Sequence, residues 1–274
     1  MSGGLGNQLF QYAAGRALAL RTGSQLQLDL SFYRKGRHRV FELDKLPIQA
    51  EVPRPADGFS ATGRLRSLIR RTLGAEKMYR EAHFHYDAQF QLLQPPVTLH
   101  GYFQSELYFA RYAQSIRAEL AIPEPDDTVS LKLSRQMSEA VPTALHIRRR
   151  DYVTSSKVSK IFAPGTIDYY TRAMEHIPGT DPVFVFSDDV GWVKQNLPAV
   201  KPLVFPPVNA VRPALADLWL MTRAHHHIIA NSSFSWWGAW LAGGRKGLTI
   251  APRQWFNDVT VNDNDLIPAH WIRL

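Results

Sequence analysis

Hydrophobic and polar positions alternate in a regular rhythm through the second half of the chain. Short runs rich in β-branched and aromatic residues predict buried strands, and the longer segments between them carry apolar residues at helical spacing. The predicted strands are 143–147, 182–187, 202–205, 226–230 and 247–251, and the predicted helices are 130–140, 167–177, 191–197, 213–224 and 234–242. This alternation is typical of a doubly wound parallel sheet with helices on both faces.

The first half predicts fewer regular elements. Residues 8–22 have helical spacing up to Gly23, and residues 25–30 alternate like a strand. Residues 97–103 predict a further strand and residues 105–120 a helix. Prolines and acidic residues at 122–127 predict a linker, so we expect two domains, 1–124 and 125–274.

Composition narrows the class of protein. The chain is 45% hydrophobic and 20% charged, with no apolar stretch of membrane-spanning length and no signal-peptide pattern, so we expect a cytoplasmic protein. The absence of cysteine excludes disulfides, thiolate zinc sites and a cysteine nucleophile. A net charge of +8 indicates an acidic partner: nucleic acid, an anionic membrane surface or a phosphorylated small molecule.

Polar residues follow the predicted strands, where a doubly wound sheet binds its ligand. The segments leaving the strand ends are 146–152, 187–189, 231–237 and 251–253. The first of them holds three consecutive arginines, which a core cannot bury unpaired. They form either a solvated loop or an anion site, and their place at a strand end favours the site, because guanidinium groups bind phosphate through two parallel hydrogen bonds.

Other polar motifs have structural interpretations beside functional ones. Asn231, Ser232 and Ser233 precede a predicted helix, where they are good N-caps and where backbone N–H groups can also bind phosphate. Asp188 and Asp189 suit either hydrogen bonds to a ligand or a helix cap. The tryptophans that follow, Trp236, Trp237 and Trp240, are expected to pack in the core.

Two motifs look like metal sites but favour other interpretations. His225, His226 and His227 are consecutive in a predicted strand, so their side chains face opposite ways and cannot share one ion. Residues 263–265 read Asp-Asn-Asp in a polar C-terminal loop, which predicts an exposed turn. GGLGNQ at 3–8 is similar to a phosphate-binding loop, but as an isolated motif it is weak.

Three specific stretches together carry a family resemblance. GGLGNQLFQYAAGRALA (3–19), HIRRRDY (146–152) and HHIIANSSFSWWGAWLA (226–242) resemble the bacterial α-1,2-fucosyltransferases, glycosyltransferase family 11. Residues 42–48, 101–109 and 217–230 also resemble family segments, in the same order. The resemblance therefore covers nearly the whole chain.

The resemblance implies a fold and a reaction. The fold is of the GT-B type, an α/β fold with two Rossmann-like domains facing a cleft, of which the C-terminal one binds the GDP-sugar and the N-terminal one the acceptor. The implied reaction moves fucose from GDP-β-L-fucose to the 2-hydroxyl of a terminal galactoside with inversion, without a metal or other cofactor. Arginines would stabilise the diphosphate leaving group, as a metal ion does elsewhere.

The family's HxRRxD pattern falls on His146, Arg148, Arg149 and Asp151. The resemblance implies that Arg148 contacts the β-phosphate, that Arg149 organises the loop with Asp151, and that Asn7 approaches the diphosphate from the other domain. It further implies a nucleotide pocket lined by Ser187, Asp188, Asn231, Ser232, Ser233 and Phe234.

The general base is not identified by the sequence. Glu106, His85 and Asp29 are candidates on the acceptor side, and each has an equally good structural role. A dissociative transition state does not require a strong base.

The chain departs from the family pattern at two places. Family members usually carry a short apolar strand before GGLGNQ, whereas only Met1 and Ser2 precede it here. The first strand of the N-terminal domain is therefore expected to be missing, either because the start is truncated or because the first sheet lacks an edge strand. Arg150 stands where a small residue is commoner.

Three alternatives stay open. One is a nucleic-acid-binding protein, suggested by the net charge and by basic segments at 34–39 and 64–71, although no helix-turn-helix, RRM or zinc-finger signature is present. Another is a transferase that uses a different GDP-sugar, and the third is an inactive scaffold of the same fold. For the enzyme, surface-glycan biosynthesis on lipid-linked acceptors would place the basic segment 64–71 against anionic lipid at the inner face of the bacterial inner membrane.

Overall fold

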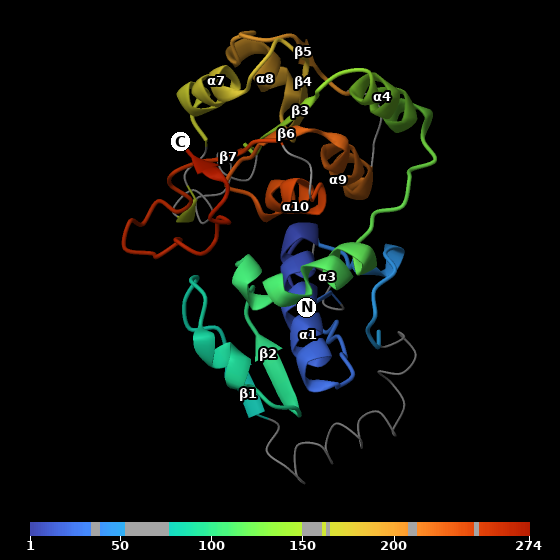
Figure 1. The fold of residues 1–274 in the computed structure, drawn as a ribbon, viewed down its shortest axis with the longest axis vertical. Coiled ribbons are helices and arrows are strands. Elements are labelled where there is room, and N and C mark those ends of the chain that lie inside the picture. Colours follow the sequence, from blue (N-terminus) through green and yellow to red (C-terminus); the bar gives the residue numbers. More distant parts are fainter. Residues whose placement is uncertain (34–38, 53–76, 150–160, 163–164, 208–212, 244–246) are drawn as a thin grey trace. The chain divides into compact units, whose positions relative to one another are not determined.

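The structure is a computed structural model that describes residues 1–33, 39–52, 77–149, 161–162, 165–207, 213–243 and 247–274. The chain divides into two compact units, residues 1–121 and 122–274 (Figure 1). Their boundary lies at the start of the proline-rich segment 122–127, against a sequence-based boundary after residue 124.

The C-terminal unit is built on a parallel sheet. In its described residues the sheet has six strands in the order β5-β4-β3-β6-β7-β8, and every pairing is parallel. The strands are β3 (Thr143–Ile147), β4 (Val183–Ser187), β5 (Leu203–Val204), β6 (His226–Ile228), β7 (Thr249–Ala251) and β8 (Ile272–Arg273). The predicted parallel sheet is confirmed. The sequence analysis missed β8, because two residues are too short to show a period.

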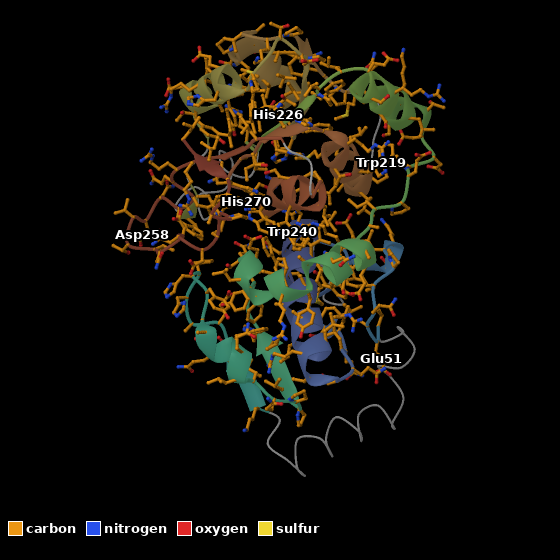
Figure 2. All side chains as sticks on the ribbon, in the orientation of Figure 1. Glu51, Trp219, His226, Trp240, Asp258 and His270 are labelled. Atoms are coloured by element: carbon orange, nitrogen blue, oxygen red, sulfur yellow. The ribbon has the colours of Figure 1, made fainter. Side chains whose placement is uncertain are left out.

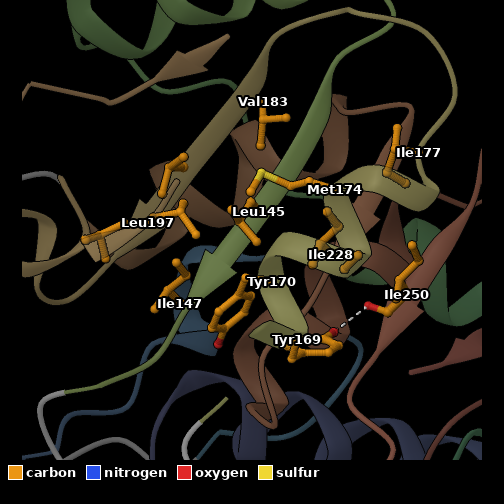
Figure 3. Close-up of a cluster of buried hydrophobic side chains, with 13 residues drawn as sticks. Leu145, Ile147, Tyr169, Tyr170, Met174, Ile177, Val183, Leu197, Ile228 and Ile250 are labelled. Atoms are coloured by element: carbon orange, nitrogen blue, oxygen red, sulfur yellow. Dashed lines mark hydrogen bonds between the residues drawn. The ribbon is translucent and has the colours of Figure 1, made fainter. Parts of the chain in front are cut away.

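Helices cover both faces of this sheet. They are α4 (Thr128–Ser138), α7 (Ile167–His176), α8 (Val190–Asn196), α9 (Ala214–Arg223) and α10 (Ser233–Leu241). Side chains of one strand alternate between two cores: Leu145 packs with Tyr170 and Met174 of α7 (Figure 3), whereas Ala144 packs with Trp219 of α9. The doubly wound arrangement predicted from the rhythm of the sequence is therefore confirmed.

The consecutive histidines have structural roles. His226 Nδ1 accepts a hydrogen bond from the Leu248 N–H at 2.9 Å, and His227 Nε2 lies 2.8 Å from the Met221 carbonyl oxygen. Figure 2 shows His226 within the side chains of the C-terminal unit. No group of three or more histidine, aspartate or glutamate side chains suited to a metal ion occurs among the described residues.

The predicted turn at 263–265 is held by a cation. Arg273 Nη1 pairs with Asp263 Oδ1 at 3.0 Å, and its Nη2 donates to the carbonyl oxygens of Asp263 and Asn264. The other oxygen of Asp263 accepts from the Trp255 N–H at 3.1 Å. Asp263 is therefore a half-buried anchor of the C-terminal loop rather than part of an exposed turn.

The described residues of the N-terminal unit include the long helix α1 and several shorter elements. Helix α1 (Leu5–Thr22) ends at Gly23, whose φ of 66° is the left-handed conformation that glycine favours in a C-cap. Strands β1 (Lys77–Arg80) and β2 (Val97–His100) form a parallel pair. The remaining elements are η2 (Leu43–Lys45), η4 (Ala88–Leu92), η5 (Glu106–Tyr108), η6 (Ala110–Tyr112) and α3 (Ala113–Glu119).

Two sequence-based elements of this unit were wrong. Residues 25–30 form an isolated parallel bridge between Gln27 and Glu51, not a strand, because only that short contact pairs their backbone. The predicted helix 105–120 is broken into η5, η6 and α3. Tyr108 and the adjacent Phe109 are both buried, and Phe109 has a φ of −137°, which is outside the helical range.

No helix in the described parts of the chain has the length and apolarity needed to cross a membrane. Most of the basic segment 34–39 and all of the segment 64–71 lie outside the described residues.

A partly buried network joins helices α1 and α3 of the N-terminal unit. Arg16 of α1 donates to both carboxylate oxygens of Glu119 at 2.8–3.0 Å, and the Tyr12 hydroxyl donates to Glu119 at 2.5 Å. Tyr12 also accepts from the Gln49 N–H at 2.9 Å. Burial and the neighbouring carboxylate raise the pKa of Tyr12, so its hydroxyl stays protonated and keeps donating.

We expect Glu119→Gln to lower the free energy of unfolding of the N-terminal unit by about 2–3 kcal/mol, because it leaves the Arg16 charge uncompensated in a partly buried site. Urea unfolding followed by far-ultraviolet circular dichroism measures the change. Glu51→Gln is the matched control, since the Glu51 carboxylate is exposed, and it should cost less than about 0.5 kcal/mol. Equal losses in the two variants would show that the network is not stabilising.

Candidate functional site

The two arginines described at the end of β3 are held by the end of β4. Strands β3 and β4 are in register, with Ile147 opposite Ser187, so the residues that follow each strand lie side by side. Arg148 Nε is 3.3 Å from Asp188 Oδ2, and the Arg149 backbone N–H donates to Asp188 Oδ1 at 2.9 Å. One carboxylate therefore pairs with the first arginine and fixes the backbone of the second.

Arg149 has a further carboxylate and an aromatic ring. Its Nη1 lies 2.8 Å from Asp189 Oδ2, and its guanidinium carbon lies 4.3 Å from the centre of the Trp192 ring. Asp189 also caps α8 by accepting from the Trp192 N–H at 3.3 Å, as one of the two sequence interpretations predicts. These contacts keep the guanidinium plane in one orientation.

The partner expected for Arg149, Asp151, lies outside the described residues, as does Arg150. The sequence analysis missed Asp189 and Trp192 as partners of Arg149. The sequence held a signal for this pairing. Two acidic residues, Asp188 and Asp189, follow the predicted strand 182–187, which comes next along the chain after the strand that leads to the arginines.

His146 lies at the same strand end and is neutral. Its side chain is buried, and burial, with a smaller contribution from the Arg148 charge, lowers its pKa to about 3. Within the described part of the chain its Nδ1 has no hydrogen-bond partner, and its ring centre is 5.6 Å from that of Phe234. The predicted donor-site residues His146 and Phe234 are therefore brought together, from the end of β3 and the first turn of α10.

The segment that links β6 to α10 has a different local structure from the expected one. The Asn231 side chain is buried and its Nδ2 donates to the Trp255 carbonyl oxygen at 3.1 Å, so it anchors the C-terminal loop. Ser232 occupies the N-cap position of α10, but its side chain makes no capping hydrogen bond. Instead, the Ser235 hydroxyl donates to the carbonyl oxygens of Ser232 and Ala230. Ser233 is the first helical residue and is half-buried.

The arrangement suits an anionic ligand. β4 pairs with β3 in register, so His146, Arg148, Arg149, Ser187 and Asp188 lie at the carboxyl end of the sheet, and Phe234 of α10 lies beside His146. Arg148 is bound to Asp188 through its Nε, and a guanidinium also carries two NH₂ groups that donate to phosphate oxygens in a planar fork. Both arginine side chains are about one quarter exposed (26% and 27%), so a ligand can reach them.

In the N-terminal unit, the loop that carries Asn7 is fixed by side chains. Gln8 is fully buried and donates to the carbonyl oxygens of Gly3 and Val40, and the Tyr33 hydroxyl donates to Gly3 at 3.1 Å. Gly3 has a φ of 82°, and a Cβ there would lie 2.7 Å from Asn7 Nδ2. Asn7 itself accepts a hydrogen bond from Gln104 at 2.8 Å. That Asn7 and Arg148 act on one diphosphate stays a prediction, since each belongs to a different unit.

The three candidates for a general base all have structural contacts. Asp29 is exposed and its Oδ1 accepts from the Ser31 N–H at 2.8 Å, which closes a turn. His85 stacks on His83 with ring centres 3.4 Å apart. Glu106 is the first residue of η5. Burial lowers the pKa of Arg117, and the negative charge of Glu106 opposes that shift.

Two other carboxylates of this unit were missed, and burial raises the pKa of both. Glu42 is half-buried beside the Asn7 loop, where its backbone N–H donates to Gln8 Oε1 at 3.0 Å. Glu81 accepts two backbone hydrogen bonds from the segment that leads to Gln104. Nothing in the local sequence of either residue predicts its burial.

Comparisons with known proteins show that the chain belongs to glycosyltransferase family 11. The family model described as Glycosyl transferase family 11 matches residues 74–274. The chain is 32% identical to an alpha-1,2-colitosyltransferase of Escherichia coli, over 100% of this chain and 97% of that protein. It is 30% identical to the O-antigen biosynthesis glycosyltransferase WbnK of Escherichia coli, over 100% of this chain and 99% of that protein.

A solved structure also resembles the chain. A point mutant of Arabidopsis thaliana FUT1 in complex with GDP aligns with a TM-score of 0.50 and 15% identity, over 91% of this chain and 68% of that chain. The likeness shows a shared fold, and the predicted GT-B-type α/β fold is confirmed.

The neutral state of His146 makes the stability of the C-terminal unit depend on pH. The unfolded chain binds a proton at this histidine below about pH 6.5, whereas the folded chain does so only near pH 3. The free energy of unfolding should therefore fall as the pH is lowered from about 6.5 towards 3, by about 1.4 kcal/mol per pH unit from this group. His146→Asn should remove that part of the slope.

Tryptophan emission is the suitable signal for this experiment, because all seven tryptophans of the chain lie in the C-terminal unit. Urea unfolding at pH 4.5 and 6.5 would be compared for the wild type, His146→Asn and the exposed-site control His176→Asn. The same pH dependence in all three proteins would contradict the assignment.

Proposed function

The chain belongs to glycosyltransferase family 11, and we propose that it is an inverting galactoside α-1,2-L-fucosyltransferase. In this proposal it moves L-fucose from GDP-β-L-fucose to the 2-hydroxyl of a terminal galactoside. The observation that carries the proposal is the pair of arginines at the end of β3, each paired with a carboxylate at the end of β4.

The two arginines would stabilise the negative charge that develops on the leaving diphosphate. Breaking the bond between the sugar and the diphosphate places negative charge on the phosphate and positive charge on the sugar. Arg148 would donate two hydrogen bonds to the β-phosphate, and Arg149 would add positive charge while Trp192 and Asp189 hold its plane. Because the cations are held before the reaction begins, little reorganisation is needed during the reaction.

The other donor-site residues have supporting roles in this proposal. Phe234 and the neutral His146 would form an apolar wall beside the arginines, and a low dielectric there strengthens the hydrogen bonds to phosphate. Ser187, Asp188, Ser232 and Ser233 would contact the nucleotide, and Asn231 would hold the loop. Asn7 would donate its side-chain amide to the diphosphate from the N-terminal unit.

The donor sugar has a specific alternative. Because a full-length relative is named as an alpha-1,2-colitosyltransferase, another GDP-linked deoxyhexose is the second candidate. Colitose lacks the 3-hydroxyl of fucose, so parallel assays with GDP-fucose and GDP-colitose on a galactoside would separate the two. Release of GDP that depends on the acceptor, with one donor preferred, identifies the sugar.

The proposed setting is surface-glycan synthesis at the inner face of the bacterial inner membrane. It rests on the similarity to a glycosyltransferase of O-antigen biosynthesis and on the net charge of +8. The acceptor would be a galactose-terminated glycan, carried on a lipid, and anionic lipid would attract the basic chain.

We expect both Arg148→Ala and Arg148→Lys to lower kcat by about 100-fold or more, because a lysine is a point charge and cannot replace a planar fork. Steady-state release of GDP measures the loss, and tryptophan emission checks that the C-terminal unit is folded. Arg172→Lys is the matched control, since Arg172 pairs with Asp168 on the exposed surface of α7 and should leave kcat unchanged. Near-normal turnover in Arg148→Lys would contradict the two-bond contact.

We also expect GDP binding and transfer to persist in EDTA, because the arginines supply the positive charge that the leaving group needs. Trp192 lies against Arg149, so its emission should report GDP binding in a titration. Activity that is lost in EDTA and recovered with Mg²⁺ or Mn²⁺ would show that the arginines do not replace a metal.

A further inference from the structure

The turn after β2 is held by one carboxylate. The Glu81 backbone N–H donates to the His100 carbonyl oxygen at 3.0 Å, which extends the β1–β2 pair by one residue. Both oxygens of the Glu81 side chain then accept backbone hydrogen bonds from the turn, from Tyr102 at 2.6 Å and from Phe103 at 2.9 Å. The carboxylate thus occupies the inside of the turn.

This turn has an unusual backbone conformation. Among the described residues, Phe103 is the one non-glycine residue with a positive φ, at 55°. Such a conformation is sterically disfavoured for a residue with a Cβ, and it persists only where its surroundings impose it. The Phe103 ring is buried, stacked on Tyr79 and packed edge-on against Tyr108, while Glu81 holds its N–H.

Gly101 leaves room for the Glu81 side chain, because a glycine has no Cβ. A Cβ at this residue would lie 2.4 Å from Glu81 Cβ and 2.6 Å from its Oε2. No side chain can occupy that space without moving Glu81 away from the two N–H groups. The glycine, the carboxylate and the strained residue therefore form one local unit.

The residue that follows the strained position is Gln104. Its side chain is buried, and its Nε2 donates to Asn7 Oδ1 at 2.8 Å, across 97 positions of sequence. An asparagine amide has an oxygen end that accepts and a nitrogen end that donates. By binding the oxygen end, Gln104 determines which way the amide is turned, and the NH₂ end is the one suited to an anion.

We propose that Gln104 is a positioning residue for Asn7, and that Glu81 holds the turn which places Gln104. The proposal rests on the proposed function, in which the Asn7 amide donates to the diphosphate of the donor. A change in the Phe103 backbone to an ordinary negative φ would redirect Gln104, because the two residues are adjacent. In this proposal the strained turn fixes the orientation of the Asn7 side-chain amide on α1.

The test is a double-mutant cycle between Gln104 and Asn7. Gln104→Met keeps the length of the side chain and removes the amide donor, and we expect kcat to fall by about 10-fold or more while the KM for the GDP-sugar changes little. In an Asn7→Ala background, Gln104→Met should cause less than about a 2-fold further loss, because its effect passes through Asn7. A merely structural role would lower turnover in both backgrounds.

Gln91→Met is the matched control in the same unit. Gln91 is exposed and donates to the Tyr86 hydroxyl, away from Asn7, so its replacement should leave kcat unchanged. Two further variants cover the case in which Gln104→Met does not fold. Gln104→Glu keeps the shape of the side chain but places an acceptor against Asn7 Oδ1. Glu81→Gln leaves one backbone N–H of the turn without a carboxylate oxygen. Both variants should lower kcat in the wild-type background but not in the Asn7→Ala background.

Two results would overturn the proposal: full activity in the Gln104 variants, or losses that multiply when the Asn7 and Gln104 changes are combined. Circular dichroism checks that the N-terminal unit is folded in each variant. Failure of the proposed function gives a different result, because the wild type would then release no GDP from either GDP-fucose or GDP-colitose in the presence of a galactoside.

Discussion

The register between β3 and β4 is the constraint on which the candidate site depends. Because Ile147 lies opposite Ser187, the two arginines that follow β3 meet the two aspartates that follow β4. A shift of one residue would turn the side chains of β3 to the other face and would separate these pairs. The two cores that the strands separate, around Met174 on one face and Trp219 on the other, resist such a shift. Packing inside the sheet thus determines the charge arrangement at its edge.

The N-terminal unit orders its polar groups in a different way. Its described residues form only one short strand pair, and side-chain hydrogen bonds replace extended backbone pairing. Gln8 and Gln104 each join segments far apart in the sequence, and Glu119 joins α1 to α3. Since a buried amide or carboxylate is costly without its partners, each of these groups specifies a single arrangement of the loops around it.

The sequence predicted most of the sheet and helices of the C-terminal unit and fewer elements of the N-terminal one. The buried strands around Leu145 and Val185 are short and mostly apolar, so both their existence and the position of His146, Arg148 and Asp188 at strand ends followed from the pattern. The bridge at Gln27 could not be distinguished from a strand, because alternation alone does not show whether a partner strand is adjacent. The partners of Arg149, and the anchor at Glu81, depend on which segments meet in three dimensions, which no local pattern records.

The pairing of the arginines has a consequence for how an anion arrives. Among the described residues at this strand edge, two arginines face two carboxylates, so the charges of these four residues balance. A phosphate that binds here meets arginines already paired with fixed carboxylates, so its binding does not release a cloud of mobile counterions. Recognition of this kind changes little with ionic strength, in contrast to the steep salt dependence of a basic groove on nucleic acid. In the proposed function, this edge selects its ligand by shape and hydrogen-bond geometry, and a polyanion that lacks a diphosphate gains little from it.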